Sequence, residues 1–234
     1  MQNSLTAKKE RDSWFENIKG FLMICVVVGH LIGTCISKYP TMNFLYHYIY
    51  SFHMPAFLFL TGYFARFHRR KLVLGLIYPY ILFQIFYRIF DGLIYNSKGT
   101  FTIEFGTPYW ILWYLLVTIF YYLLLPLLDT KNRNSQITIV ITSIALALLA
   151  GFDTSLGYYG SLARFFSFLP FFIAGFYTAR AETNFRFPAW FIFVLGVILI
   201  VASHYIITSP EITKKVLYGS YSYEKAKYNA GIKL

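Results

Sequence analysis

Long apolar runs, separated by short polar segments, dominate the chain. An α-helix needs roughly 20 mostly apolar residues to cross the hydrocarbon core of a bilayer. Seven runs reach or approach that length, and the fifth is the shortest. They are residues 18–36, 42–65, 72–95, 109–128, 137–152, 162–177 and 188–207. The pattern predicts an all-α fold: a polytopic bundle of transmembrane helices, formed by a single integral membrane domain over residues 1–234.

Composition supports a membrane environment. Apolar types make up 57% of the 234 residues and charged types only 13%, whereas soluble domains carry about 25% charged residues. A net charge of +11 can indicate nucleic-acid binding. Here, however, Lys and Arg lie in short segments between apolar runs, where they act as a topology signal. We therefore expect the lipid bilayer as a partner, and no nucleic acid.

The basic residues also predict an orientation. One set of loops holds twelve of them: Lys8, Lys9, Arg11, Lys19, Arg66, Arg69, Arg70, Lys71, Lys131, Arg133, Arg180 and Arg186. The opposite loops hold Lys38, Lys98 and, at the edge of a run, Arg164. Cytoplasmic loops carry the excess of Lys and Arg, so we predict a cell-membrane protein with a cytoplasmic N-terminus. This orientation places the tail after residue 207 outside, and the five lysines of that tail agree less well with the positive-inside rule.

The two cysteines, Cys25 and Cys35, lie in the first apolar run and show neither metal-ligand spacing nor a disulfide framework. We expect no metal ion. The first run lacks a signal-peptide cleavage pattern and is predicted to be retained.

Ionisable residues inside spans are costly, so each is a candidate functional residue. At ~1.5 Å per residue, His30 lies about 18 Å from the start of its span and His53 about 16 Å. Both depths fall near the middle of a core roughly 30 Å thick. Each histidine can instead make an ordinary interhelical hydrogen bond. That interpretation is stronger for His53, because Pro55 disturbs the helix beside it.

The first span carries further charge on the face of His30. Lys19 precedes His30 by eleven residues, almost three helical turns, and therefore shares its face at the cytoplasmic mouth. Glu16 lies three residues before Lys19 and can pair with it. Arg88 and Asp91 have the same spacing in the third span, where a structural ion pair is the favoured interpretation.

A basic cluster, residues 66–71, follows the second span. It is first of all a positive-inside signal. Arg66 and Arg69 are also spaced to share a helical face, and guanidinium groups suit phosphate. An anion site is therefore the second interpretation of this cluster.

An ordered set of short motifs resembles one family. Residues 16–20 and 28–30, with ten residues between Lys19 and His30, resemble the first span of the acyltransferase-3 superfamily, membrane O-acyltransferases that modify glycans. Lys19 occupies the position where arginine is the commoner residue in this family. Residues 52–55 (FHMP) with 61–63 (TGY) resemble the fucose 4-O-acetylase-like branch, and residues 66–69 match the R-x-x-R pattern of the superfamily. Later landmarks follow in order at 79–80, 110–115, 168–175 and 217–220. Family members usually have about ten spans, so we expect this chain to be a truncated bundle.

The resemblance implies transfer of an acyl group, usually acetyl, from cytoplasmic acyl-CoA to a hydroxyl of a cell-surface or lipid-linked glycan. Arg66 and Arg69 would hold the donor's phosphates. His30 would act as a general base on the acceptor hydroxyl or carry the acyl group itself, and the sequence leaves both open. Glu16 and Lys19 would adjust the charge at the cytoplasmic entrance to the site. His53 is a secondary candidate for the catalytic role.

Acceptor binding is assigned to aromatic residues and to Arg164. Trp113 and Tyr114, with Tyr63, offer surfaces to a sugar, although packing in the core is the plainer role for each. The alternative function is a transporter or flippase of a lipid-linked sugar, since transporters also bury charged groups at the midplane. A non-catalytic scaffold would not explain two histidines at matched depth.

Overall fold

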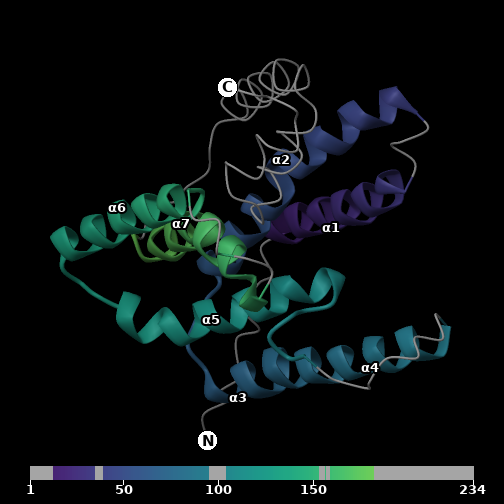
Figure 1. The fold of residues 1–234 in the computed structure, drawn as a ribbon. Helices are drawn as coiled ribbons and strands as arrows, with labels where there is room; N and C mark the ends of the chain where they lie inside the picture. Colours follow the sequence, from purple (N-terminus) through teal and green to yellow (C-terminus); the bar gives the residue numbers. More distant parts are fainter. Residues whose placement is uncertain (1–12, 35–38, 95–103, 153–155, 157–158, 182–234) are drawn as a thin grey trace, which may run out of the picture.

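The computed structural model describes residues 13–34, 39–94, 104–152, 156 and 159–181. Every regular element within these residues is helical (Figure 1). The elements are α1 (Ser13–Gly33), α2 (Pro40–Tyr63), α3 (Arg69–Leu72), η1 (Val73–Ile77), α4 (Tyr78–Ile94), η2 (Trp110–Leu112), α5 (Trp113–Leu128), α6 (Arg133–Ala150), η3 (Tyr159–Ser161) and α7 (Leu162–Arg180). The all-α prediction is confirmed for the described residues.

The elements match six of the seven predicted spans, and the seventh, 188–207, lies outside the described residues. Five helical segments are long and apolar enough to cross a membrane: α1, α3 to α4, η2 to α5, α6, and η3 to α7. α2 has the length, at 24 residues, but carries more polar side chains, including His47 and His53. The chain is a multi-pass membrane protein.

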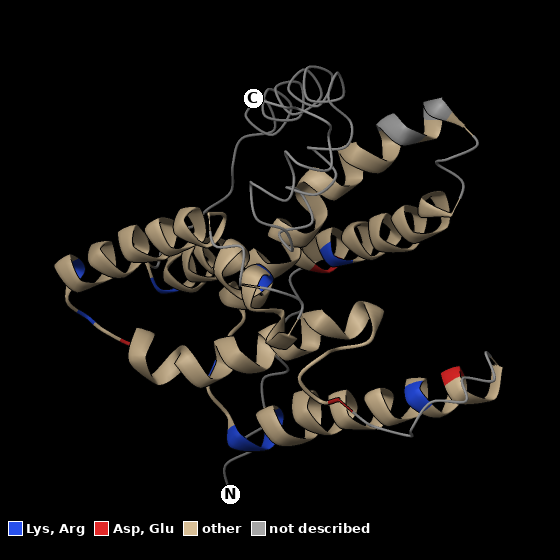
Figure 2. Ribbon diagram, viewed as in Figure 1, with Lys and Arg blue, Asp and Glu red and all other residues tan. Residues whose placement is uncertain are grey.

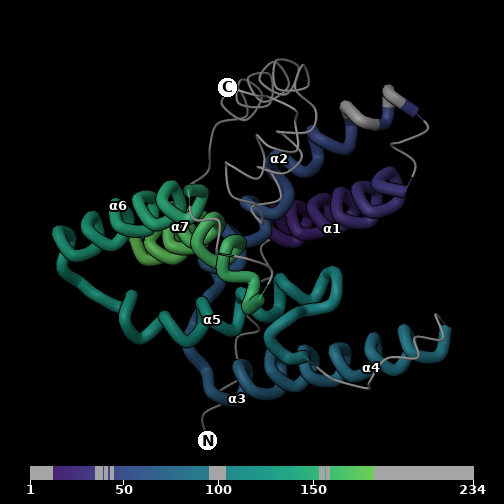
Figure 3. Tube along the Cα trace, viewed as in Figure 1, coloured from purple at the N-terminus to yellow at the C-terminus, as the bar shows by residue number. Residues whose placement is uncertain are grey.

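The third predicted span is one continuous helix that contains a widened π turn, traced without a break from α3 to α4 in Figure 3. The turn at Val73–Ile77 lies just before Pro79. Proline has no backbone N–H and cannot donate to the carbonyl four residues earlier. A locally widened turn accommodates this loss without ending the helix.

The core forms where α2 crosses α7, the most extensive helix contact in the described bundle. Gly62 and Gly175 make this contact possible. A Cβ at Gly62 would overlap the carbonyl of Phe172, and one at Gly175 would overlap the carbonyl of Phe59. Small residues at helix interfaces let backbones approach closely in membranes, where packing replaces the hydrophobic effect as the driving force.

Other helices extend this core on both sides. α6 packs on α7 and α1 on α2, while α5 contacts α7 and the π turn. Five core side chains of the described residues have no exposed surface: Leu58, Val117, Tyr121, Phe172 and Phe176. The Tyr121 hydroxyl donates to the Phe165 carbonyl at 2.7 Å, so this buried phenol has a hydrogen-bond partner.

Basic residues gather at one end of the bundle, on the left in Figure 2. We call this the basic end and define it by Arg69, Lys71, Lys131, Arg133 and Arg180. It is formed by the N-termini of α3 and α6 and the C-termini of α5 and α7, as expected for helices that alternate in direction. The opposite end, called the far end, holds Trp110 and Glu104.

Candidate functional site

His30 and His53 lie together where α1 meets α2. His30 is half-buried in the last turn of α1, and its ring centroid is 5.6 Å from that of Trp110 in an edge-to-face contact. His53 is only 3% exposed and interacts electrostatically with His30. Its ring also contacts Tyr50, with centroids 4.8 Å apart. Three elements, α1, α2 and η2, therefore contribute to a single histidine site.

Glycines on α1 allow α2 to approach this site closely. A Cβ at Gly29 would stand 3.1 Å from the ring of Tyr50, and one at Gly33 would stand 3.3 Å from Tyr46. Both distances are tighter than ordinary van der Waals contact. The tyrosines of α2 therefore lie directly on the α1 backbone, and Tyr50 fills the space beside His30.

The depth of each histidine in a bilayer stays a prediction, but the contact of Phe15 with Tyr63 gives their relative level. Counted from that contact, His30 lies about 22 Å along α1 and His53 about 15 Å along α2. Residue 18, the predicted start of the first span, already lies inside α1. Side chains lean towards the N-terminus of their helix, so on these antiparallel helices the two imidazoles lean towards each other. This orientation shortens the distance between the two imidazoles, although their backbones lie at different levels along the helices.

A backbone hydrogen bond determines which nitrogen of His53 carries a proton. Its Nδ1 lies 2.7 Å from the carbonyl oxygen of Ile49. A carbonyl can only accept, so Nδ1 must donate. The neutral ring then carries its lone pair on Nε2, which makes that nitrogen an acceptor.

Arg164 connects α7 to the same region. It is 7% exposed, and its guanidinium carbon lies 4.8 Å from the centre of the Trp113 ring. It also interacts electrostatically with Tyr50, the residue that contacts His53. Left-handed backbone at Gly160 (φ 64) and Ser161 (φ 50) turns the chain into α7 just before this arginine. Arg164 thus packs on Trp113 and lies within electrostatic range of Tyr50.

The predicted sugar-binding aromatics are packing residues in this structure. Trp113 stacks on Phe168 with centroids 5.7 Å apart. The Tyr114 hydroxyl shares a hydrogen bond with the hydroxyl of Thr61, which joins α5 to α2. Their plainer role in the core is therefore the one that the contacts describe.

Glu16 and Lys19 form the predicted ion pair, with Nζ and Oε1 3.3 Å apart. The Lys19 ammonium lies 4.2 Å from the centre of the Phe64 ring, at the end of α2. Eleven residues separate Lys19 from His30, or ~16 Å along α1. The pair therefore belongs to the basic end rather than to the histidine site. Arg88 and Asp91 also pair as predicted, at 3.5 Å.

The prediction that Arg66 and Arg69 share a helical face is wrong. Arg66 lies in the connection between α2 and α3, while Arg69 is the first residue of α3. Between them, His68 has extended backbone (φ −141, ψ 113), which ends any common helix. Both arginines are nevertheless exposed at the basic end.

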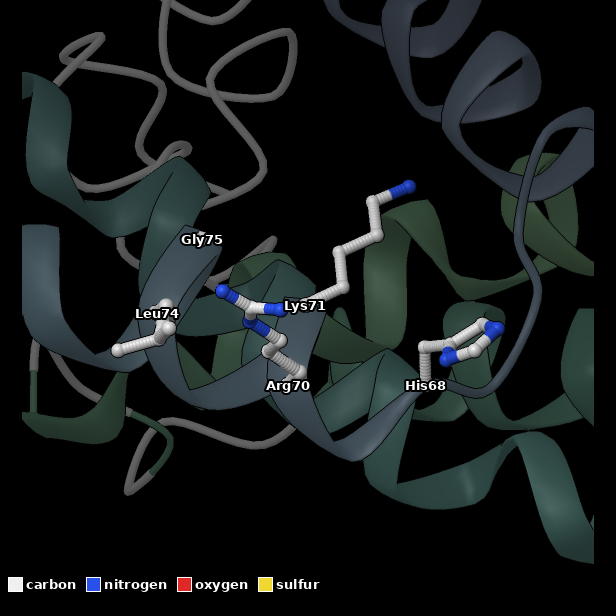
Figure 4. Close-up of a pocket in the computed structure, with 5 residues that line it drawn as sticks. All are labelled: His68, Arg70, Lys71, Leu74 and Gly75. Atoms are coloured by element: carbon white, nitrogen blue, oxygen red, sulfur yellow. The ribbon is translucent and has the colours of Figure 1, made fainter.

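Further cations surround this position. Arg180 interacts electrostatically with Arg66 and forms an ion pair of 3.8 Å with Asp129. An open pocket of about 440 Å³ adjoins the cluster, lined by His68, Arg70, Lys71, Leu74 and Gly75 (Figure 4). The basic end therefore presents a concave, positively charged surface suited to phosphate groups.

Sequence reasoning missed Tyr50, Gln84 and the contact role of Trp110. Trp110 was quoted only as a motif landmark, and Gln84 carries no charge, so the search for ionisable residues inside spans passed over it. A search for any polar side chain within a span would have found Gln84. Among the described residues, no three or more His, Cys, Asp or Glu side chains are grouped to hold a metal ion.

The fold and site define a multi-pass membrane protein with a pair of histidines between α1 and α2, one buried and one half-buried, and a cationic surface at one end. A family model described as an acyltransferase domain matches residues 12–228. The chain belongs to this family, the acyltransferase-3 superfamily, which confirms the resemblance seen in the motifs.

Two curated relatives share part of the chain. It is 29% identical over 163 residues to nodulation protein NolL of Sinorhizobium fredii, a match that covers 59% of this chain and 42% of the relative. It is 27% identical over 156 residues to nodulation protein NolL of Mesorhizobium japonicum, covering 58% and 41%. The chain thus spans less than half the length of these relatives. No solved structure matches it.

Proposed function

We propose that this protein transfers an acyl group, in the simplest case acetyl, from cytoplasmic acyl-CoA to a hydroxyl of a cell-surface or lipid-linked glycan. The observation that carries the proposal is that His53 interacts electrostatically with His30, and that Tyr50, which contacts His53, interacts electrostatically with Arg164. A base and a buried cation at one site are what acyl transfer to an alcohol requires. Membership of an acyltransferase family supports the same reaction.

The donor would bind at the basic end. Arg66 and Arg69 are exposed there beside the open pocket, and acyl-CoA carries phosphate groups that guanidinium binds through two hydrogen bonds. The thin pantetheine arm would run along α1 from Lys19 towards His30, a span of ~16 Å. The N-terminus of α1 would then face the cytoplasm, in agreement with the basic loops.

The chemistry would take place at His30. Its imidazole accepts the proton of the acceptor hydroxyl while the oxygen attacks the thioester carbonyl. Arg164 stabilises the oxyanion that forms. The C–S bond then breaks, and the CoA thiolate takes up the proton from His30. Two products leave, the O-acyl sugar and free CoA.

Loss of the imidazole should stop this reaction. With labelled acetyl-CoA and lipid-linked glycans, we expect transfer by the wild-type protein in nanodiscs. His30→Gln should lower transfer by about 10²–10⁴-fold while acyl-CoA binding persists, because an amide cannot take the proton. Ile24→Ala, at an exposed position of α1 away from the face shared by Lys19 and His30, is the matched control. Glycan translocation that consumes no thioester would instead establish a transporter.

The donor assignment has its own test. Replacing Arg66 and Arg69 by Gln removes two charge-assisted contacts, each worth roughly 1.5–3 kcal/mol. The double variant should bind acyl-CoA at least about 100-fold more weakly and bind glycan normally, as measured by titration of each ligand. Arg133→Gln, on α6 at the same end, is the control for a general loss of positive charge. Unchanged acyl-CoA affinity in the double variant contradicts the assignment.

A further inference from the structure

We propose that Trp110 is the stacking surface for the acceptor sugar beside His30, and that Gln84 is the residue that positions it. The proposal rests on the proposed function, because it assumes a carbohydrate acceptor. It assigns acceptor contact to a residue other than Trp113 and Tyr114, whose rings pack against Phe168 and Phe57 respectively.

Trp110 has the position and the free surface that a sugar site needs. Its side chain is 66% exposed, although one edge contacts the His30 ring at 5.6 Å and an angle of 78°. The C–H face of a pyranose is apolar and packs on an aromatic ring, while its hydroxyls remain at the rim. A sugar on Trp110 would therefore present a hydroxyl next to the His30 imidazole.

The backbone at Trp110 is unusual for such a bulky residue. Its φ is 37°, in the left-handed region that large side chains rarely adopt. Strained backbone of this kind persists where the surroundings hold it, and it concentrates at functional sites. An ordinary tryptophan of the membrane interface needs only to sit at the headgroup level and has no requirement for this conformation.

Gln84 supplies what holds the strained segment. It is 1% exposed on α4, and its Nε2 donates to the carbonyls of Glu104 and Thr107, both at 2.8 Å. Its Oε1 accepts from the backbone N–H of Tyr109 at 3.1 Å. One side chain thereby bonds three backbone groups in the segment that leads directly into Trp110.

Neighbouring contacts extend this support. The Tyr80 hydroxyl donates to the carbonyl of Phe105 at 2.6 Å. The Gly160 N–H donates to the carbonyl of Gly106, which ties the same segment to the turn before α7 and Arg164. Unpaired backbone groups are expensive inside a membrane protein, so these bonds are a strong constraint. Gln84 therefore helps to place both Trp110 and the turn that leads to Arg164.

Steady-state kinetics of the protein in nanodiscs test the proposal. Trp110→Ala should raise the acceptor KM by about 10-fold, the effect of losing an aromatic contact, with the acetyl-CoA KM unchanged. Trp110→Phe should recover most of the acceptor affinity. Trp14→Ala, a tryptophan at the basic end, should leave both KM values at the wild-type level.

Gln84→Met keeps the side-chain length but removes its hydrogen bonds. It should weaken acceptor use as Trp110→Ala does, and the double variant should be little worse than Trp110→Ala alone, because both act through one surface. Leu93→Ala, an exposed residue of α4, is the matched control. Acetyl-CoA binding verifies that each variant is folded.

The outcomes separate the two proposals. Wild-type transfer combined with an unchanged acceptor KM in Trp110→Ala overturns the stacking role alone. A rise in both KM values, or loss of acetyl-CoA binding in both Trp110→Ala and Trp110→Phe, shows a structural role and also overturns it. Absence of transfer to any glycan by the wild-type protein overturns the proposed function and this inference together.

Discussion

At the scale of single residues, the two histidines differ in how firmly the structure holds them. His53 is buried and has its Nδ1 proton engaged by Ile49, so much of its side chain serves the local structure. His30 makes its described ring contact with Trp110, at the exposed end of α1. This difference supports His30 as the base and gives His53 a supporting position.

Replacing His53 by Asn tests that division of roles. The Asn amide N–H₂ can still donate to the Ile49 carbonyl, whereas the Nε2 acceptor is lost. We expect transfer to fall by no more than about 10-fold, far less than for loss of a general base. Single-turnover rates with labelled acetyl-CoA provide the measurement. A loss as large as that of His30→Gln would place Nε2 of His53 in the chemistry.

At the scale of elements, close packing of α2 on α7 places the site. α2 carries His53 and Tyr50, and α7 carries Arg164, so the distance between these helices determines whether their side chains meet. The crossing depends on Gly62 and Gly175, where no side chain fits. A shift of either helix by the width of a methyl group would change the site as well as the core.

Gly62→Ala and Gly175→Ala should each destabilise the protein. The added Cβ would overlap a carbonyl of the other helix, and such overpacking costs about 1–3 kcal/mol. Thermal unfolding in detergent should show a lowered midpoint and reduced acyl transfer. Gly20→Ala and Gly92→Ala are the controls, since nothing lies within 4 Å of the added atom at either position. Equal stability of all four variants would contradict the backbone contact.

At the scale of the whole molecule, the proposed function depends on the separation between the basic end and the far end. Lys71, Arg133 and Arg180 lie at one end, and His30 and Trp110 lie towards the other. A donor that enters from one face of the membrane and an acceptor that enters from the opposite face would meet at His30. The orientation of the chain in the membrane therefore determines which compartment supplies each substrate.

Cysteine labelling with an impermeant reagent tests this orientation in intact cells. In a background without Cys25 and Cys35, cysteines at positions 69 and 131 should be protected, because basic loops remain in the cytoplasm. Cysteines at positions 98 and 104 should react from outside; position 98 lies outside the described residues. Reaction at position 131 before permeabilisation would reverse the predicted topology.

Much of the architecture could be predicted from the sequence. The six described spans were found because roughly 20 apolar residues are required to cross a bilayer, whatever the tertiary arrangement. The pairs Glu16–Lys19 and Arg88–Asp91 followed from helical spacing alone, which is local geometry. Motif order identified the superfamily, and its match confirms that identification.

Only the tertiary structure decided which of these residues meet. Extended backbone at His68 separates Arg66 from the helix of Arg69, and spacing in sequence assumes a continuous helix. The close approach of Tyr50 to α1 depends on Gly29, and the hydrogen bonds of Gln84 hold the backbone that leads into Trp110. These join residues that lie far apart in the chain. Periodicity shows which residues share the face of one helix, whereas a site built from several helices depends on how their faces pack together.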